Sequence, residues 1–520
     1  MRLTIAARLL TAVTVIAVAE IQERIIQQPL DHFSGLSTGP QLLQRYFVDN
    51  QYYHADGPIL LYSVGERTAL ASDLSDGWIG ELARATGGLA VLLEQRFYGE
   101  SVPDSSGTDV WQYLTVEQMM ADIKRLVEHI GSTIPEWVTP ARQQRRRGRA
   151  STGVPIVLIG GSFAGSLMAW TKQRYPDLES FVVASSAPLY VVDGYWEFDK
   201  MVAWRLPCSQ TLSLAVRAID RTLDDGNAVQ IAELKQQFGL DYIKSIANFV
   251  AALTIQVSSL MQAPADAQSR ESIVRYCSLL ERPGMTTVEA LAQMTREYSQ
   301  LHRLVPSSEC PETGDDLAWL WQQCTELGMW QTAPLQNSSS ADESTWFAQR
   351  LRSRRLDAWH YRQQCDKCLP SSSLRISRIE QQKKAQFRIL AKQTLDAFQK
   401  NVPSDVVLTV GELDPWLRLT AVGLGVRLTD NVIMARNASH AEDLLFSVTD
   451  NGQVNPEVQI ARSRIVQAVK QWSLKHKRGF RQGSTASSAS KHVHLLLASR
   501  GLRLGAIVAI LCALVIKYAL

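Results

Sequence analysis

The chain has 520 residues, of which 46% are hydrophobic, and its formal net charge is only +3. This apolar content is ample for a packed interior, and the length suits a catalytic core that carries a large insertion. The small net charge argues against nucleic acid or another charged polymer as the partner.

Residues 1–19 have the pattern of a secretory signal peptide. A positive start precedes an apolar run, and Ala17-Val18-Ala19 offers a small-residue cleavage site before Glu20. A short membrane anchor is the alternative, but the apolar run is too short to span a bilayer comfortably. We therefore expect the signal to be cleaved and the mature chain to follow the secretory pathway.

Strand and helix patterns alternate in the first third of the chain. Apolar runs typical of buried strands lie at 58–64, 89–97, 154–159 and 181–184. Residues 115–131 have one apolar helical face, and a capping box of Thr115 and Gln118 begins that helix. This alternation predicts a mainly parallel sheet with helices on both faces.

From residue 195 to residue 381 the sequence pattern predicts consecutive helices. One of them begins with the capping box Thr286-x-x-Glu289. Strand patterns return only at 406–410 and 431–434. We call the helical insertion the cap. The expected organisation is a signal peptide 1–19, the first half of the core 20–194, the cap 195–381, the second half of the core 382–477, a linker 478–503 and an apolar tail 504–520.

A serine among small residues directly follows the strand pattern at 154–159. The segment Gly160-Gly161-Ser162-Phe163-Ala164-Gly165 resembles a nucleophile elbow, a tight turn that leaves no room for a branched side chain beside the serine. Ala164 stands where the G-x-S-x-G pattern has its second glycine. The alternative interpretation is an ordinary glycine-rich turn between a strand and a helix.

An acid and a histidine follow the last two strand patterns. Asp414 comes shortly after 406–410 and His440 shortly after 431–434. A nucleophilic serine needs a histidine to take its proton and an acid to orient that histidine, and Ser, Asp, His is the chain order of α/β-hydrolases. Alone, Asp414 would be a turn residue before proline and His440 a solvated loop residue; together with Ser162 they indicate catalysis.

Several further segments carry a resemblance to one enzyme family. The chain resembles the prolyl-specific serine peptidases, which include lysosomal Pro-X carboxypeptidase, a lysosomal dipeptidyl aminopeptidase and the thymus-specific serine protease. The similar segments are Gln28–Phe33, Glu94–Ser101, Tyr113–Gln118, Val157–Trp170, Ala184–Pro188, Trp321–Gly328 and Gly411–Trp416.

The resemblance implies an α/β-hydrolase fold with a helical cap over the site, and a triad of Ser162, Asp414 and His440. The backbone N–H groups of Phe163 and of Gly65, in the loop after the first strand, are the expected oxyanion donors. Trp416 is the expected wall of an apolar slot for proline, with core packing as the alternative.

The resemblance also implies serine exopeptidase action after proline, with an acidic pH optimum and no metal or other cofactor. A prolyl endopeptidase and a lipase or esterase on the same fold are the alternatives. A carboxypeptidase needs a cation for the substrate's terminal carboxylate, whereas an aminopeptidase needs an acid for the terminal amine. Both kinds of residue lie near the expected loop or strand ends, namely Glu66, Arg67, Glu94, Arg96 and Glu100, so the end that is cut stays open.

Six of the seven cysteines fall in the cap, which in a secreted protein indicates disulfides. Cys365-x-x-Cys368 could suggest zinc or redox chemistry, but we expect structural bridges and no metal. Asn337 is the expected glycosylation site; a second sequon, at Asn437, lies so close to His440 that a glycan would crowd the site.

The end of the chain predicts membrane attachment. Small residues at 483–490, a basic spacer and the apolar tail 504–520 match the parts of a lipid-anchor signal. A single spanning helix is the alternative, although the tail is short for one and contains Lys517. We expect a membrane-attached protein of the lysosome, vacuole or cell exterior that acts on peptides. A homodimer is one open alternative for its oligomeric state.

Overall fold

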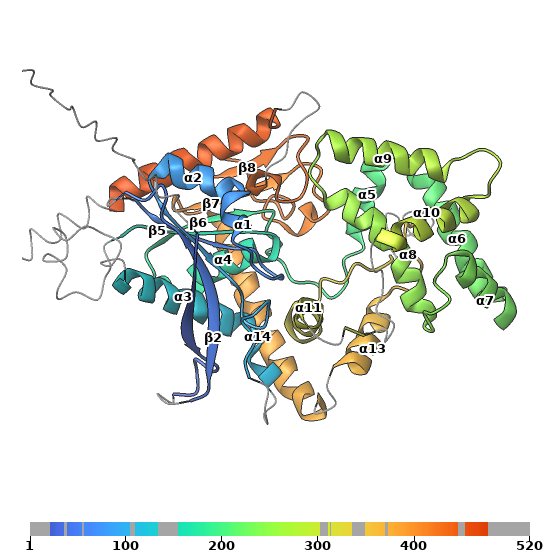
Figure 1. The fold of residues 1–520 in the computed structure, drawn as a ribbon, viewed down its shortest axis with the longest axis horizontal. Coiled ribbons are helices and arrows are strands. Elements are labelled where there is room, and N and C mark those ends of the chain that lie inside the picture. The colour runs from blue at the N-terminus through green and yellow to red at the C-terminus, as the bar shows by residue number, and fades with distance from the viewer. Residues whose placement is uncertain are drawn as a thin grey trace, which may run out of the picture.

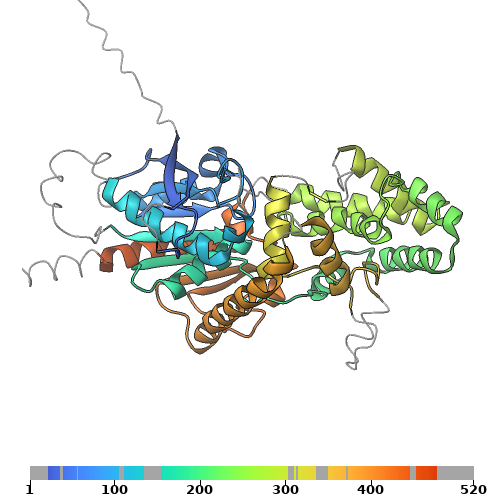
Figure 2. The same ribbon diagram turned by 90° about the horizontal axis from the view of Figure 1, so that it is seen from below.

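The computed structural model describes residues 21–35, 39–54, 57–104, 110–133, 154–301, 310–311, 314–334, 349–369, 373–445 and 453–476. An eight-stranded sheet with helices on both faces forms one part of the molecule, and a group of helices lies beside it (Figures 1 and 2). The expected signal peptide 1–19, the sequon at Asn337, the linker 478–503 and the tail 504–520 lie outside the described residues.

The sheet has the strand order β1-β2-β4-β3-β5-β6-β7-β8. β1 and β2 are antiparallel to their neighbours, and all later pairs are parallel. The strands are β1 (Gln22–Pro29), β2 (Gln41–Asp49), β3 (Ile59–Ser63), β4 (Leu89–Leu93), β5 (Ile156–Gly161), β6 (Ser180–Ser185), β7 (Val406–Gly411) and β8 (Val432–Ala435). With helices on both faces this is the α/β-hydrolase fold, as the sequence predicted.

Apolar side chains fill both faces of the sheet. Ile59 and Leu61 of β3 belong to the cluster under α3 (Val116–Thr133), α4 (Ser162–Arg174) and α14 (Ser373–Lys400). Leu60 belongs to the opposite cluster, under α2 (Trp78–Thr86) and a helix at 456–476. Successive strand residues point to opposite faces, so a continuous apolar run is what a strand between two helix layers requires.

Most of the helices between β6 and β7 in the chain form the lobe beside the sheet (Figure 1). They are α5 (Glu197–Arg205), α6 (Ser209–Asp225), α7 (Ala228–Gln237), α8 (Ile246–Gln262), α9 (Ala267–Leu280), α10 (Thr287–Leu301), α11 (Asp315–Gln322) and α13 (Ala358–Cys368). This lobe has its own apolar cluster, which includes Phe198, Phe238 and Phe249. The following helix, α14, runs without a break through residue 381 and packs against α4.

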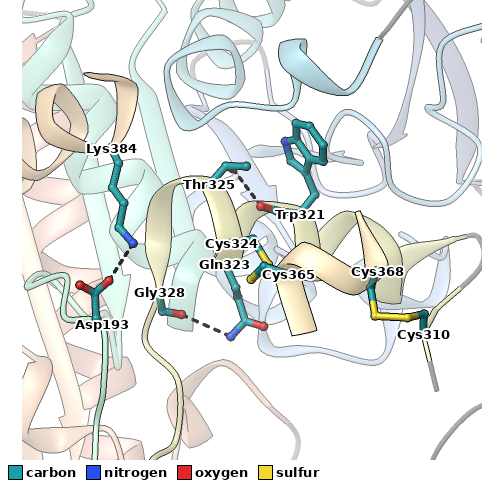
Figure 3. The surroundings of a disulfide bond; sticks show 10 residues. All are labelled: Asp193, Cys310, Trp321, Gln323, Cys324, Thr325, Gly328, Cys365, Cys368 and Lys384. Atoms are coloured by element: carbon teal, nitrogen blue, oxygen red, sulfur yellow. Dashed lines mark hydrogen bonds and ion pairs between the residues drawn. A yellow bond between two sulfur atoms is a disulfide. The ribbon is translucent and has the colours of Figure 1, made fainter. Parts of the chain in front are cut away.

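Three disulfides join parts of this lobe and its border with the sheet. Cys208 bonds to Cys277, Cys310 to Cys368 and Cys324 to Cys365. The last two both tie α13 to earlier segments of the chain (Figure 3). The expectation of structural disulfides is therefore confirmed, and the two cysteines of the C-x-x-C pattern bond to different partners.

The two predicted capping boxes differ in outcome. The Thr286–Glu289 box is complete, because each side chain bonds to the other residue's backbone N–H. At α3 only the Thr115 hydroxyl acts as predicted, accepting the Gln118 N–H at 3.2 Å. The Gln118 amide instead donates to Asp31 at 2.6 Å, so a long-range contact to the segment after β1 replaces the local one.

Candidate active site

Ser162 lies at the junction of β5 and α4 in a strained conformation. Its φ is +54°, in the left-handed region that non-glycine residues rarely occupy. A Cβ atom on Gly160 would lie 2.4 Å from the carbonyl carbon of Ala164, and one on Gly165 would lie 2.8 Å from the carbonyl oxygen of Gly160. The tight turn therefore needs glycine at 160 and 165.

Asp414 and His440 follow β7 and β8 and are hydrogen-bonded to each other. His440 Nδ1 lies 2.8 Å from Asp414 Oδ1, and the backbone N–H of Trp416 donates to the same oxygen at 2.8 Å. Asp414 is fully buried. An ionised carboxylate only accepts hydrogen bonds, so Nδ1 carries a proton and Nε2 is left as the basic nitrogen.

The charges around His440 set its proton affinity. Burial lowers the pKa of the imidazole, but the charge and hydrogen bond of Asp414, helped by Glu66 and Asp443, outweigh burial and raise the pKa above its ordinary value. Burial also raises the pKa of Glu66 and of Asp443. The histidine therefore lies in an acidic environment, in which its protonated form is stabilised.

The loop of His440 is hydrogen-bonded to the cap on one side. The hydroxyl of Ser439 donates to the carbonyl of Met261 at 3.1 Å, at the end of α8. The carboxylate of Glu442 accepts the N–H groups of Ser439 and of Ala265, both at 2.8 Å. The histidine is therefore held by contacts that cross from the sheet to the helical lobe.

The same loop is bound to the sheet on its other side. The Asp443 carboxylate accepts hydrogen bonds from the hydroxyl of Ser185 and, at 2.7 Å, from that of Thr409. These two residues belong to β6 and β7. The N–H of Ala441 donates to the hydroxyl of Ser186 at 2.9 Å. Sequence reasoning missed Asp443, although an acid three residues after the histidine was visible.

The expected oxyanion donors differ in their surroundings. The N-cap of α4, Gly161, offers no side chain to cap the first turn, in which Phe163 lies. The first N–H groups of a helix have no partner within the helix, so this turn suits an anion. Gly65 has φ of +83°, but its N–H donates to the hydroxyl of Ser63 at 3.2 Å.

Ser162 opens into a cavity of about 580 Å³ between the sheet and the cap. Glu66, Phe163 and Trp416 line it on the side of the sheet, and residues of α8, α11 and α13 line it on the side of the cap. Trp416 stacks on Tyr195, with ring centroids 5.2 Å apart. It packs against the apolar clusters of both parts, so the expected wall residue lies at their junction.

Most of the charged residues that the sequence offered for substrate binding do not reach this cavity. Glu94 is fully buried and bonds to Arg45, and Arg96 is fully buried and bonds to Asp122. Arg67 pairs instead with Asp73, and Glu100 with Arg45. Of the five candidates, Glu66 alone is among the described residues that line the cavity.

The structure also places Ser166 and the second sequon residue, Asn437. Ser166, four residues after Ser162, is fully buried and donates to the carbonyl of Pro188 at 2.9 Å. Asn437 lines a second cleft with Arg205 and Arg270, and it does not line the cavity of Ser162.

Within the described residues, no cluster of His, Cys, Asp or Glu is arranged to hold a metal ion.

Comparison with known proteins agrees with this arrangement of sheet, elbow and acid–histidine pair, which together define a serine hydrolase. The profile of the serine carboxypeptidase S28 family matches residues 28–465. The chain therefore belongs to the serine carboxypeptidase S28 family and is a serine-type peptidase.

Relatives at about one quarter identity span most of the chain. The thymus-specific serine protease of Homo sapiens is 26% identical over 481 residues, which is 86% of each chain. Lysosomal Pro-X carboxypeptidase of Bos taurus is 26% identical over 493 residues, covering 86% of this chain and 87% of that one. Among solved structures, proline iminopeptidase of Mycobacterium smegmatis has a TM-score of 0.32 at 9% identity, covering 87% of this chain and 99% of that one.

Proposed function

We propose that this peptidase hydrolyses the peptide bond after a proline close to one end of a peptide, with Ser162, His440 and Asp414 as its triad. The observation that carries the proposal is the 2.8 Å bond between His440 Nδ1 and the buried Asp414, on loops that follow neighbouring strands. The strained φ of Ser162, after β5 of the same sheet, supports it.

The mechanism is acyl transfer. His440 Nε2 takes the proton of Ser162 as the serine oxygen attacks the carbonyl carbon of the prolyl residue, and Asp414 stabilises the imidazolium. The oxyanion is held by the N–H of Phe163 at the start of α4, and by Gly65 if its N–H exchanges the Ser63 hydroxyl for the substrate. The protonated histidine then gives its proton to the leaving amine, and water hydrolyses the acyl-enzyme.

The selectivity for proline rests on aromatic surface. The ring of proline offers apolar surface and no hydrogen-bond donor, so an apolar slot beside the serine would favour it. Trp416 is a suitable wall, because Tyr195 stacks on it and its indole N–H donates to Gln262 at 2.7 Å. Both contacts fix the ring. The similarity to lysosomal Pro-X carboxypeptidase also favours a prolyl substrate.

Replacement of the serine tests the proposed triad. We expect Ser162→Ala to lower kcat by at least about 10⁴-fold on a proline-containing peptide, because the nucleophile is lost while the cavity is retained. The same variant should lose labelling by a fluorophosphonate probe, and Ser166→Ala, whose hydroxyl bonds to Pro188, should keep it. Equal labelling of wild type and Ser162→Ala would contradict the triad.

Substrate panels separate the alternatives. A peptide with alanine in place of proline should be cleaved more slowly by about 10- to 200-fold, the usual range for one apolar contact. Cleavage of a doubly blocked peptide as fast as a free one would favour a prolyl endopeptidase. Turnover of acyl esters but of no peptide would favour a lipase or esterase.

We also propose secretion and membrane attachment. The similarity to lysosomal Pro-X carboxypeptidase and to a probable extracellular serine carboxypeptidase of Arthroderma benhamiae supports the secretory route. Within the part of the chain that the structure describes, none of the helices is long and apolar enough to cross a membrane. The proposal of an anchor therefore rests on the tail 504–520, and that of a glycan on Asn337.

Expression with and without residues 491–520 tests the anchor. We expect the full chain to sediment with membranes and the truncated chain to appear in the soluble fraction. Full-length protein that is wholly soluble, with its tail still detected by mass, would contradict attachment. Removal of N-glycans should lower the mass of the wild type but not that of Asn337→Gln.

A further inference from the structure

The cavity of Ser162 contains a carboxylate that forms no ion pair with any described residue. Glu66, in the loop after β3, lines this cavity together with the serine. Among the described residues, no arginine, lysine or histidine forms an ion pair with it. The neighbouring Arg67 is turned to Asp73, with which it forms two hydrogen bonds. The charge of Glu66 is therefore left for a ligand to neutralise.

The cavity does contain an arginine, but its donors are occupied. Arg352 donates to both oxygens of Asp199, at 2.9 and 2.8 Å. Its Nη1 donates to the backbone carbonyl of Gln331, and its Nη2, which also bonds to Asp199, donates to the side-chain oxygen of Gln331, both at 3.1 Å. Of the described residues that line the cavity, it is the only lysine or arginine. The positive charge of Arg352 is therefore already paired with Asp199.

The other ionisable groups of the cavity do not restore positive charge. His360 is buried, which lowers the pKa of its imidazole and favours the neutral form. Asp316, in the first turn of α11, adds a second carboxylate to the described lining. The field within this cavity therefore attracts cations and opposes a terminal carboxylate.

We propose that Glu66 binds the free N-terminal ammonium of the substrate, so that the enzyme releases short N-terminal fragments that end in proline and does not act as a carboxypeptidase. This inference rests on the proposed function, since it orients a substrate on Ser162. An ammonium at Glu66 forms a charge-assisted hydrogen bond, whereas a substrate bound in the opposite direction brings a carboxylate against a carboxylate.

The partial burial of Glu66 is consistent with this role. Burial raises the pKa of its carboxyl group, and the charges of His440 and Arg67 oppose that shift only in part. A desolvated carboxylate is unfavourable until it is paired. Binding of a cationic ligand therefore offsets the desolvation free energy that the carboxylate costs in the empty site. The α-amine of a peptide is protonated below pH 7.7, which covers the neutral and acidic range.

Four versions of one proline-containing peptide test the proposal on the wild-type enzyme: free at both ends, N-acetylated, C-amidated and blocked at both ends. We expect N-acetylation to lower kcat/KM by at least about tenfold, the effect of one charge-assisted hydrogen bond, and amidation to have little effect. Loss of cleavage on amidation, with the acetylated peptide cut as fast as the free one, would overturn the proposal.

The variant Glu66→Gln completes the test. We expect it to lower the ratio of kcat/KM for the free peptide to kcat/KM for the N-acetylated peptide by about 10- to 100-fold, because only the free peptide has an ammonium to lose. The loss of the Glu66 charge near His440 acts on both peptides alike and cancels in this ratio. Glu100→Gln is the matched control, since Glu100 is exposed and pairs with Arg45 outside the cavity. An equal loss on both peptides would overturn the assignment of Glu66.

The outcomes distinguish this proposal from the proposed function. Fluorophosphonate labelling of Ser162 in Glu66→Gln reports whether the site is still folded. Wild-type cleavage after proline that ignores both blocking groups would overturn amine recognition and leave the prolyl peptidase intact. Wild-type enzyme that cleaves none of the four peptides would contradict the proposed function and, with it, this inference.

Discussion

His440 is surrounded by carboxylates, and this decides in which protonation state it is found. Asp414, Glu66 and Asp443 together raise the pKa of its imidazole above the ordinary value despite burial. A general base acts only when it is neutral. The acidic optimum that the family resemblance implies is therefore not favoured by the groups around the histidine.

The pH dependence of the reaction follows from this direction. Because the pKa of His440 is raised, the neutral form that the proposed mechanism requires is present above the raised pKa and is lost as the pH falls through it. We expect kcat/KM to rise with pH and to level off above 6.5, the ordinary histidine value, with about a tenfold loss for each pH unit below the midpoint. A kcat/KM profile that is still level down to pH 5 would contradict this.

Asp443→Asn offers a control for the same effect. The amide keeps one oxygen to accept from one of the hydroxyls of Ser185 and Thr409, and its NH2 group can donate to the other. The substitution removes a negative charge that raises the pKa of His440. The midpoint of the profile should move to lower pH. Asp405→Asn, which removes a charge at the opposite end of β7, where Asp405 pairs with Lys172, should leave the midpoint unchanged.

At the scale of elements, a buried ion pair joins three parts of the sheet layer. Arg96, just after β4, bonds to both oxygens of Asp122 in α3, at 2.6 and 2.8 Å, and neither side chain is exposed. It also donates to the carbonyls of Pro29 and Leu30, at the end of β1. One guanidinium group thus connects β1, β4 and α3.

Loss of this arginine should destabilise the whole fold. We expect Arg96→Ala to lower the free energy of unfolding by about 3–5 kcal/mol, because Asp122 loses its bidentate arginine partner and stays buried with only His32 bonded to its carboxylate. Arg174→Ala is the comparison. Arg174 pairs with Glu117, which is in α3 like Asp122, but this pair is exposed and contributes at most about 1 kcal/mol. Urea unfolding of both variants measures the difference, and equal losses would show that burial of the pair does not matter.

Prediction from sequence succeeded for elements with continuous apolar runs and failed for others. β3 to β8 were expected because each is apolar and buried on both faces. β1 was missed because Gln22–Pro29 is largely polar and exposed at the edge of the sheet, where neither alternation nor a continuous apolar run marks a strand. The acid–histidine pair was predicted from strand order, whereas the α8, α11 and α13 residues of the cavity depend on tertiary packing that no local pattern shows.

For the whole molecule, the described disulfides are confined to one region. All three lie between residues 208 and 368, in the chain that separates β6 from β7. The sheet contains none of them and depends on its apolar clusters instead. The two parts of the molecule are therefore stabilised by different means.

Reduction should accordingly affect the cap first. Each disulfide closes a segment of 41 to 69 residues, and removal of such a bond typically costs about 2–5 kcal/mol. We expect a reductant, or the double variant Cys208→Ala/Cys277→Ala, to lower the Tm and to make the cap helices sensitive to a protease before the sheet is cut. Cys512→Ala, which changes a cysteine of the tail that belongs to none of these three bonds, should leave the Tm and the digestion pattern unchanged. Simultaneous digestion of sheet and cap would contradict separate stabilisation.

The hydrogen bonds of Ser439 and Glu442 to the cap have a consequence for which polypeptides can be substrates. If the cap swung away to admit a folded protein, these bonds to Met261 and Ala265 would break, and the loop that holds His440 would be released. With His440 as the proposed general base, opening and turnover would then exclude each other. We therefore expect short, unstructured ends that enter the closed cavity to be cleaved and folded proteins to be spared.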